Sequence, residues 1–163
     1  MRVVSIYEAG GFPKLVLESK KAFAADYGLD SAYWTHFDVQ GASEVVAYLK
    51  ANLRDLATHY HAVYQQSEPG TDRVANFEES SRWYGAYLAS FAQDPEAPSI
   101  HYRLADLLLE NEDFGDAARA YAQTAYDYPR HDQAAAAGYA SIFARRQQEK
   151  AALESDKQAV KRA

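Results

Sequence analysis

Apolar residues recur three and four positions apart along most of this chain, a spacing that is typical of amphipathic helices. The clearest set on one helix face comprises His101, Leu104, Ala105 and Leu108. Short apolar runs that could begin a strand, such as Val3-Val4, are brief and fall within helical spacing. The pattern therefore predicts an all-α fold without strands.

Glycine and proline divide the pattern into separate helices. Gly10-Gly11-Phe12-Pro13 ends a first short helix and begins a second over about 13–27, which Gly28 ends. A short segment around Tyr33-Trp34 follows. Further helices are predicted over about 43–66, 71–91, 98–110, 113–128, 132–149 and 155–163.

Residue spacing repeats along these predicted helices. On first helices of successive pairs, the matching sets are Leu53, Leu56, Ala57 and Tyr60; His101, Leu104, Ala105 and Leu108; and Ala136, Tyr139, Ala140 and Phe143. On second helices they are Phe77, Ser80, Tyr84 and Tyr87, and Phe114, Ala117, Tyr121 and Thr124. Small residues at matched positions let two helices approach closely. One pair cannot bury both of its faces, so several pairs are expected to stack.

The segment 98–129 resembles the tetratricopeptide repeat superfamily. That pattern asks for a large residue, Leu and a small residue on one helix, then Ala, an aromatic residue and Pro on the next. The matching positions hold His101, Leu104, Ala105, Leu108, Ala117, Tyr121 and Pro129. The resemblance implies a right-handed α-solenoid of helix-turn-helix pairs.

On this interpretation residues 1–163 form a single helical-repeat domain. It would contain an irregular partial repeat (1–40), a repeat with an inserted loop (43–92), the well-matched repeat (98–129) and a truncated repeat (132–163). The additional residues around 65–74 would form either a longer first helix or a projecting loop. Both ends would expose apolar stacking surface.

The resemblance also implies a function, because such repeats are scaffolds that bind a peptide or protein partner on their concave face. By position this face would carry Arg54, Thr58, His61, Tyr102, Asp106, Leu109, Ser141 and Arg145. Tyr and Arg supply much of the energy at protein interfaces. The alternatives are a purely structural spacer within a larger multi-repeat protein, and a self-association module that forms a homodimer through its uncapped ends.

Two further stretches each have a simpler interpretation than binding. Tyr33, Trp34 and Phe37 form an aromatic group that either packs the irregular first repeat or serves as an exposed anchor for a partner. The charged stretch from Arg145 to Arg162 is most simply a solvated helix face.

Composition and charge narrow the classes of function. A net charge of −6 over 163 residues argues against a nucleic-acid partner, which needs clustered Lys and Arg. The absence of cysteine excludes disulfides and thiolate chemistry. No apolar run is long enough for direct membrane insertion. Similarity to long bacterial tetratricopeptide proteins suggests the cell envelope, with the cytoplasm as the alternative.

No catalytic, metal or cofactor site is expected. His59 and His61 are two residues apart on a helix, so their side chains diverge by about 200° and cannot share an ion. No nucleophile elbow, phosphate-binding loop or paired-carboxylate motif occurs in the sequence. His101 falls at a packing position, which favours a half-buried core residue over a catalytic base.

Overall fold

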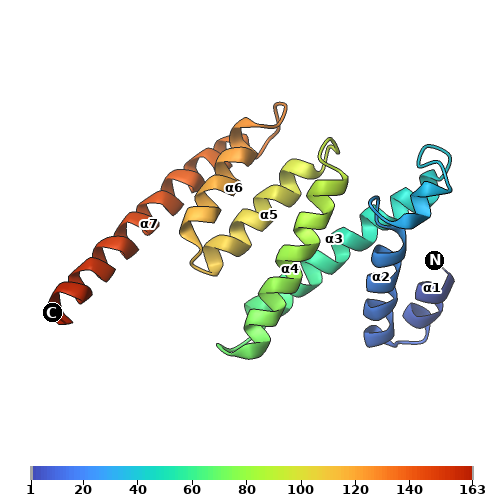
Figure 1. The fold of residues 1–163 in the computed structure, drawn as a ribbon, viewed down its shortest axis with the longest axis horizontal. Coiled ribbons are helices and arrows are strands. Elements are labelled where there is room, and N and C mark those ends of the chain that lie inside the picture. The colour runs from blue at the N-terminus through green and yellow to red at the C-terminus, as the bar shows by residue number, and fades with distance from the viewer. Residues whose placement is uncertain (1, 163) are drawn as a thin grey trace. The chain divides into compact units, whose positions relative to one another are not determined.

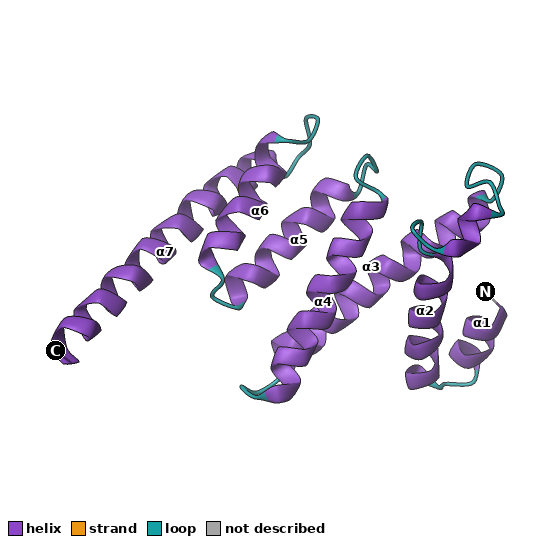
Figure 2. Ribbon diagram, in the orientation of Figure 1, coloured by secondary structure: helices purple, strands orange, loops and turns teal. Residues whose placement is uncertain are grey.

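The computed structural model describes residues 2–162, which form α-helices and one short 3-10 helix (Figures 1 and 2). The elements are α1 (Arg2–Ala9), α2 (Pro13–Tyr27), the 3-10 helix η1 (Ala32–Thr35), α3 (Ser43–Gln66), α4 (Thr71–Ser90), α5 (Ala97–Glu110), α6 (Phe114–Tyr126) and α7 (Ala134–Arg162). No strand occurs among the described residues, which confirms the all-α prediction.

The helices gather into two compact units that meet in the sequence between Gln93 and Asp94. In unit 1, α3 packs along α4, α2 packs against α3, and α1 packs against α2 (Figure 1). In unit 2, α6 packs against both α5 and α7. The right-handed α-solenoid and the assignment of residues 1–163 to a single domain remain predictions.

Unit 1 is built around a close approach of α3 and α4. Ala57 of α3 and Ser80 of α4 are both fully buried, and the Ser80 hydroxyl donates a 2.9 Å hydrogen bond to the Ala57 carbonyl. Because this hydrogen bond joins a short side chain of α4 to the backbone of α3, the two helices must lie close together, which requires small residues where they cross. Larger side chains then fill the space on either side, among them Leu53, Leu56 and Tyr84.

Unit 2 has a comparable core of small residues. Ala105 of α5, Ala117 and Ala118 of α6, and Ala144 of α7 are all fully buried in one cluster. Tyr121 of α6 is buried in the same cluster. The small positions singled out in the sequence, Ala57 and Ser80 in unit 1 and Ala105 and Ala117 in unit 2, are therefore core positions in both units.

The additional residues of the second predicted pair lengthen its helices. The turn between α3 and α4 is short, and Arg73 closes it by donating hydrogen bonds to the carbonyls of Tyr64 (2.8 Å) and Ser67 (3.1 Å). The Arg73 guanidinium also lies 3.9 Å from the centre of the Tyr64 ring. Of the two alternatives, the projecting loop is wrong, because these contacts hold the chain close to the helix ends.

The end of the chain differs from the prediction. Two helices were expected after residue 132, but α7 runs unbroken for 29 residues. The stretch around Ser155 contains neither Gly nor Pro, and Lys, Ala, Leu and Glu around it are strong helix formers. The third matched set also does not pack as expected, since Tyr139 is 79% and Phe143 52% exposed. Ala137, Ser141 and Ala144 are the buried residues of α7 instead.

The aromatic group near η1 packs onto α2. Tyr33 stacks on Phe37 with ring centres 4.5 Å apart, and its other side meets the edge of Tyr27 at 4.8 Å. The Trp34 indole donates a 3.0 Å hydrogen bond to the Tyr27 carbonyl. These contacts favour the packing interpretation, although Phe37 stays 54% exposed.

The core assignment predicts that Leu56→Ala lowers the free energy of unfolding by about 2–5 kcal/mol, because Leu56 is fully buried and truncation leaves a cavity. The matched control is Leu153→Ala, at a position 60% exposed, where the change should stay below about 0.5 kcal/mol. Chemical denaturation of the two variants measures both. Equal effects at the two positions would contradict this core.

Candidate functional site

Unit 1 contains an open hollow of about 360 Å³ where α1, α2 and α3 meet. Its lining residues are Tyr7, Glu8, Gly11, Phe12, Pro13, Val16, Leu17, Lys20, Asp55, Leu56 and His59. Most of the exposed lining surface is apolar, and the charged groups are contributed by one residue from each of the three helices. A hollow of this size and character can accept a large apolar side chain.

The turn between α1 and α2 shapes one edge of the hollow. Gly11 has φ +72°, in the left-handed region that glycine enters without steric strain. A Cβ on Gly10 would lie 2.7 Å from the Phe12 ring, so any other residue at this position would displace the ring from its present place. Pro13 then begins α2, where its missing N–H is harmless. Phe12 is left 54% exposed at the edge of the hollow.

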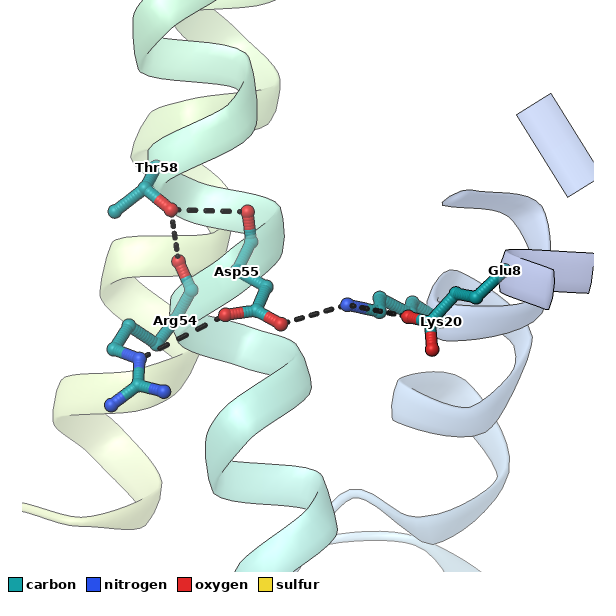
Figure 3. A network of polar contacts seen from close by, with 5 residues as sticks. All are labelled: Glu8, Lys20, Arg54, Asp55 and Thr58. Atoms are coloured by element: carbon teal, nitrogen blue, oxygen red, sulfur yellow. Dashed lines mark hydrogen bonds and ion pairs between the residues drawn. The ribbon is translucent and has the colours of Figure 1, made fainter. Parts of the chain in front are cut away.

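A polar network joins the three helices beside the hollow (Figure 3). The Lys20 ammonium on α2 lies 2.7 Å from the Asp55 carboxylate on α3 and 3.9 Å from the Glu8 carboxylate on α1. The Lys20 side chain is only 15% exposed, whereas that of Glu8 is 53% exposed. Lys20 therefore orients two carboxylates, and Glu8 remains accessible to a partner.

Two of the predicted binding residues belong to this network. Arg54 Nε lies 3.8 Å from Asp55 Oδ1, on the side of that carboxylate away from Lys20 (Figure 3). The Thr58 hydroxyl donates to the Arg54 carbonyl at 3.0 Å and is 3.2 Å from the Asp55 carbonyl. Arg54 and Thr58 thus lie near the hollow, without lining it.

His61, the third residue predicted on α3, is in a different position from the one expected. It is 9% exposed, and its Nδ1 lies 3.1 Å from the Tyr84 hydroxyl of α4. Its Nε2 is 3.4 Å from the Gln65 amide. Because both ring nitrogens face protein groups, His61 belongs to the α3–α4 interface and is not available on an open surface.

The predicted residues of α5 lie together in unit 2. The Tyr121 hydroxyl of α6 donates a hydrogen bond to the Asp106 carboxylate, and the Tyr102 ring meets Tyr121 edge-on at 5.3 Å. Burial and the Asp106 carboxylate raise the pKa of Tyr121. Leu109 packs half-buried against the same cluster. Tyr102, Asp106 and Leu109 thus contribute to the packing of α5 against α6 within unit 2.

Arg145, the last predicted binding residue, is exposed on α7. The predicted set is therefore divided between the two units, with Arg54 and Thr58 together in one and Tyr102, Asp106 and Leu109 together in the other.

Sequence reasoning missed the hollow itself. The Gly-Gly-Phe-Pro stretch at 10–13 indicated a tight turn, but residues 1–40 matched the repeat pattern poorly and offered no register for Phe12, Val16 or Leu17. The usable signal in the sequence was an aromatic residue, Phe12, placed between two glycines and a proline.

Neither a metal-binding cluster nor a membrane-spanning helix occurs in the described part of the chain. Within residues 2–162, no group of three or more His, Asp or Glu side chains could hold a metal ion. No helix in this range is long and apolar enough to cross a membrane.

Comparison with known proteins adds no relative. No protein-family model, no curated protein and no solved structure matches the chain. The functional argument therefore rests on the residues of the chain itself.

The contact between His61 and Tyr84 predicts a defined loss of stability. Tyr84→Phe removes the hydroxyl and leaves His61 Nδ1 without that partner in a buried interface, so the free energy of unfolding should fall by about 1 kcal/mol. Tyr139→Phe removes a hydroxyl from a side chain 79% exposed and should change stability by less than about 0.5 kcal/mol. Thermal or chemical unfolding measures the pair, and no difference between the two variants would argue against this hydrogen bond.

A second histidine, His101 of α5, is half-buried with Nδ1 3.1 Å from the Tyr128 hydroxyl. Burial lowers the pKa of His101 below its ordinary value of about 6.5, and the nearby Asp127 carboxylate and Gln123 offset this only in part. The unfolded chain therefore binds a proton more readily than the folded one. Stability linked to His101 is present above pH 6.5 and is lost as the pH falls below it.

We expect that lowering the pH from about 7.5 to about 5 destabilises the native chain more than a His101→Gln variant, because the variant has no group to protonate at this position. The difference between the two unfolding free energies, measured at each pH, isolates His101 from the other histidines. A difference that does not change with pH would contradict the lowered pKa.

Proposed function

We propose that this chain is a protein-interaction module built from tetratricopeptide-like helix pairs. Support comes from the two antiparallel pairs α3–α4 and α5–α6, whose matched positions carry similar residues in similar roles. Ala57 and Ser80 occupy the buried crossing of one pair, and Ala105 and Ala117 are buried in the other. Tyr84 and Tyr121, which match in the sequence, are both buried with their hydroxyls bonded to the preceding helix.

The docking site that we assign to this module is the hollow of unit 1. The observation that carries the assignment is an open, mainly apolar hollow whose edge holds an exposed Phe12 and a half-exposed Glu8. Exposed aromatic residues beside a pocket are typical anchors of protein interfaces. An apolar side chain of a partner segment would enter the hollow and contact Val16 and Leu17, which are partly exposed in its lining.

Charge specifies the partner segment further. Lys20 is held by Asp55 at 2.7 Å, so its ammonium is already satisfied, whereas Glu8 is 3.9 Å from Lys20 and largely accessible. A cationic side chain next to the apolar one would reach Glu8. The partner is therefore an extended or helical segment with a large apolar residue close to Lys or Arg.

The polar network supports binding in preference to chemistry. Lys20, Asp55 and Arg54 are engaged with one another across α2 and α3, and Thr58 bonds to the backbone of its own helix. Such contacts fix the helices that border the hollow.

A displayed library of random peptides provides the probe for this proposal. Peptides enriched on the native chain should carry an apolar residue next to Lys or Arg. Their affinity, measured by fluorescence anisotropy, should fall about tenfold in Phe12→Ser and in Glu8→Lys, because each removes a contact worth more than about 1 kcal/mol. Both positions are exposed, so the fold should be retained.

Matched controls lie on the same α1–α2 hairpin. Leu15→Ser changes an apolar residue that is 45% exposed but does not line the hollow, and Glu18→Lys reverses an exposed charge that also does not line it. Both variants should bind as the native chain does. Equal losses in variants and controls would refute the hollow as the site. A library from which no peptide is enriched would favour the structural-spacer alternative.

A further inference from the structure

Helix α7 packs against α6 with one face and exposes the opposite one. Its buried residues are Ala137, Ser141 and Ala144. A step of two residues turns about 200° around a helix, so Tyr139 lies opposite Ala137. Seven residues make nearly two full turns, which places Arg146, Leu153 and Val160 on the same side as Tyr139. These four residues form the central line of the exposed face.

The second half of α7 is exposed on all sides. Every residue from 148 to 162 is exposed, including Leu153 at 60% and Val160 at 77%. In water, a helix in a protein gains most of its stability from the packing of its apolar side chains. A partner that covers the central line would therefore stabilise this half of the helix.

Charged residues of both signs border the central line. A step of three residues turns about 60° to one side of the line, and a step of four turns about 40° to the other side. From the line these steps reach Glu149 and Asp156 on an acidic flank, and Lys150 and Lys157 on a cationic flank. Glu154 lies further around the helix, outside both flanks. One exposed face thus carries two parallel stripes of opposite charge.

Near the start of α7 the same two flanks are apolar. From Tyr139 the steps of three and four residues reach Ile142 and Phe143, which are 53% and 52% exposed. A shallow hollow of about 370 Å³ adjoins Ile142, between the end of α6 and the start of α7. Tyr126, which is 74% exposed, also lines this hollow. The hollow lies on the same flank as the acidic stripe.

We propose that this face of α7 binds the same face of a second copy of the chain, with the two α7 helices side by side and parallel. In such a two-fold pair each central residue lies beside its own counterpart, and each flank faces the opposite flank of the other copy. Glu149 then pairs with Lys150 of the second copy, and Asp156 with Lys157. Phe143 of the second copy enters the hollow beside Ile142.

The charge pattern selects the parallel orientation. In an antiparallel pair centred on Leu153, each flank would lie against itself. Lys150 would then lie beside Lys157 of the second copy, and Glu149 beside Asp156. Like charges that face each other across an interface are unfavourable. In the parallel pair every one of these groups has a partner of opposite sign.

The same pattern favours a second copy over other occupants of the face. A flat anionic lipid surface would meet Glu149 and Asp156 together with the lysines. A helix of one charge sign would satisfy only one flank. A second copy supplies both stripes at the matching spacing. Arg146, the charged residue of the central line, then lies between the Glu149 carboxylates of the two copies. This face belongs to unit 2 and does not depend on the hollow of unit 1.

Exchange of the charges tests the proposal on the whole chain. We expect a concentration-dependent dimer of the native chain in analytical ultracentrifugation. Glu149→Lys/Asp156→Lys and Lys150→Glu/Lys157→Glu each place like charges on facing flanks, so each should raise the dissociation constant about tenfold. An equimolar mixture of these two variants should restore the dimer, because an entirely cationic face then meets an entirely acidic one.

Two further variants separate the face from the net charge. Arg103→Glu/Arg130→Glu changes the net charge as much as Lys150→Glu/Lys157→Glu does, at exposed positions of the same unit outside α7, and should dimerise as the native chain does. Tyr139→Ser/Phe143→Ser removes the apolar contacts and should also raise the dissociation constant about tenfold. Circular dichroism checks that every variant keeps its helicity.

Cross-linking tests the parallel orientation. The chain contains no cysteine, so a single introduced thiol reports one position. Val160→Cys should form a disulfide-linked dimer on oxidation, because the parallel pair brings the two copies of this position together. Ser155→Cys lies about 200° around the helix from Leu153 and should stay monomeric on a denaturing gel. Equal cross-linking at both positions, or a native chain that stays monomeric at every concentration, would overturn the proposal.

The other occupants of the face give distinct results. A monomer that binds vesicles containing phosphatidylserine, and loses this binding in Lys150→Glu/Lys157→Glu, would assign the face to a lipid surface. A monomer that binds a displayed peptide, and loses it in Tyr139→Ser/Phe143→Ser, would assign the face to a different protein. Either result would replace the second copy.

Discussion

Close approach of two helices at small residues is the constraint on which both units depend. Where Ala57 faces Ser80, the α4 hydroxyl reaches the α3 carbonyl, and no larger side chain could occupy either position. Short separation at the crossing opens space above and below it, which tyrosine and leucine fill. A buried tyrosine then needs a partner for its hydroxyl, because an unsatisfied buried polar group is expensive. The Tyr84 hydroxyl is hydrogen-bonded to the His61 ring of α3, and the Tyr121 hydroxyl donates to the Asp106 carboxylate of α5.

Helix α2 is attached to the rest of unit 1 by cationic side chains as well as by apolar packing. Lys20 reaches Asp55 on α3, while Lys21 reaches Glu79 on α4 at 3.4 Å and lies 4.8 Å from the centre of the Tyr60 ring. The same helix also packs directly, since the Phe23 ring of α2 meets the Tyr48 ring of α3 edge-on at 4.8 Å and Ala24 is buried. The hollow lies beside the ionic contact between Lys20 and Asp55, both of which line it.

The sequence was sufficient for most of the fold because its local signals agreed with one another. The bounds of α2 and α3 followed from Pro13, Gly28 and the apolar spacing, and both helices are where they were predicted. The small positions Ala57 and Ala105 were recognisable as core from their repetition alone. The spacing of residues along the sequence could not show whether a polar side chain would face a partner or bond to a neighbouring helix. His61 and Asp106 were expected on a binding face, but the hydroxyls of Tyr84 and Tyr121 engage them, and this depends on contacts across two helices.

The end of the chain shows how a repeat signal and local helix propensity can diverge. Ala136, Tyr139, Ala140 and Phe143 have the spacing of core residues, and in a helix pair a following antiparallel helix would cover them. The residues after Glu149 do not turn back, because no Gly or Pro interrupts a run of strong helix formers. The continuous α7 therefore presents Tyr139 and Phe143 outward and aligns them with Arg146 and Lys150 on one face. Side chains with the spacing of core residues thus become part of an exposed helix surface.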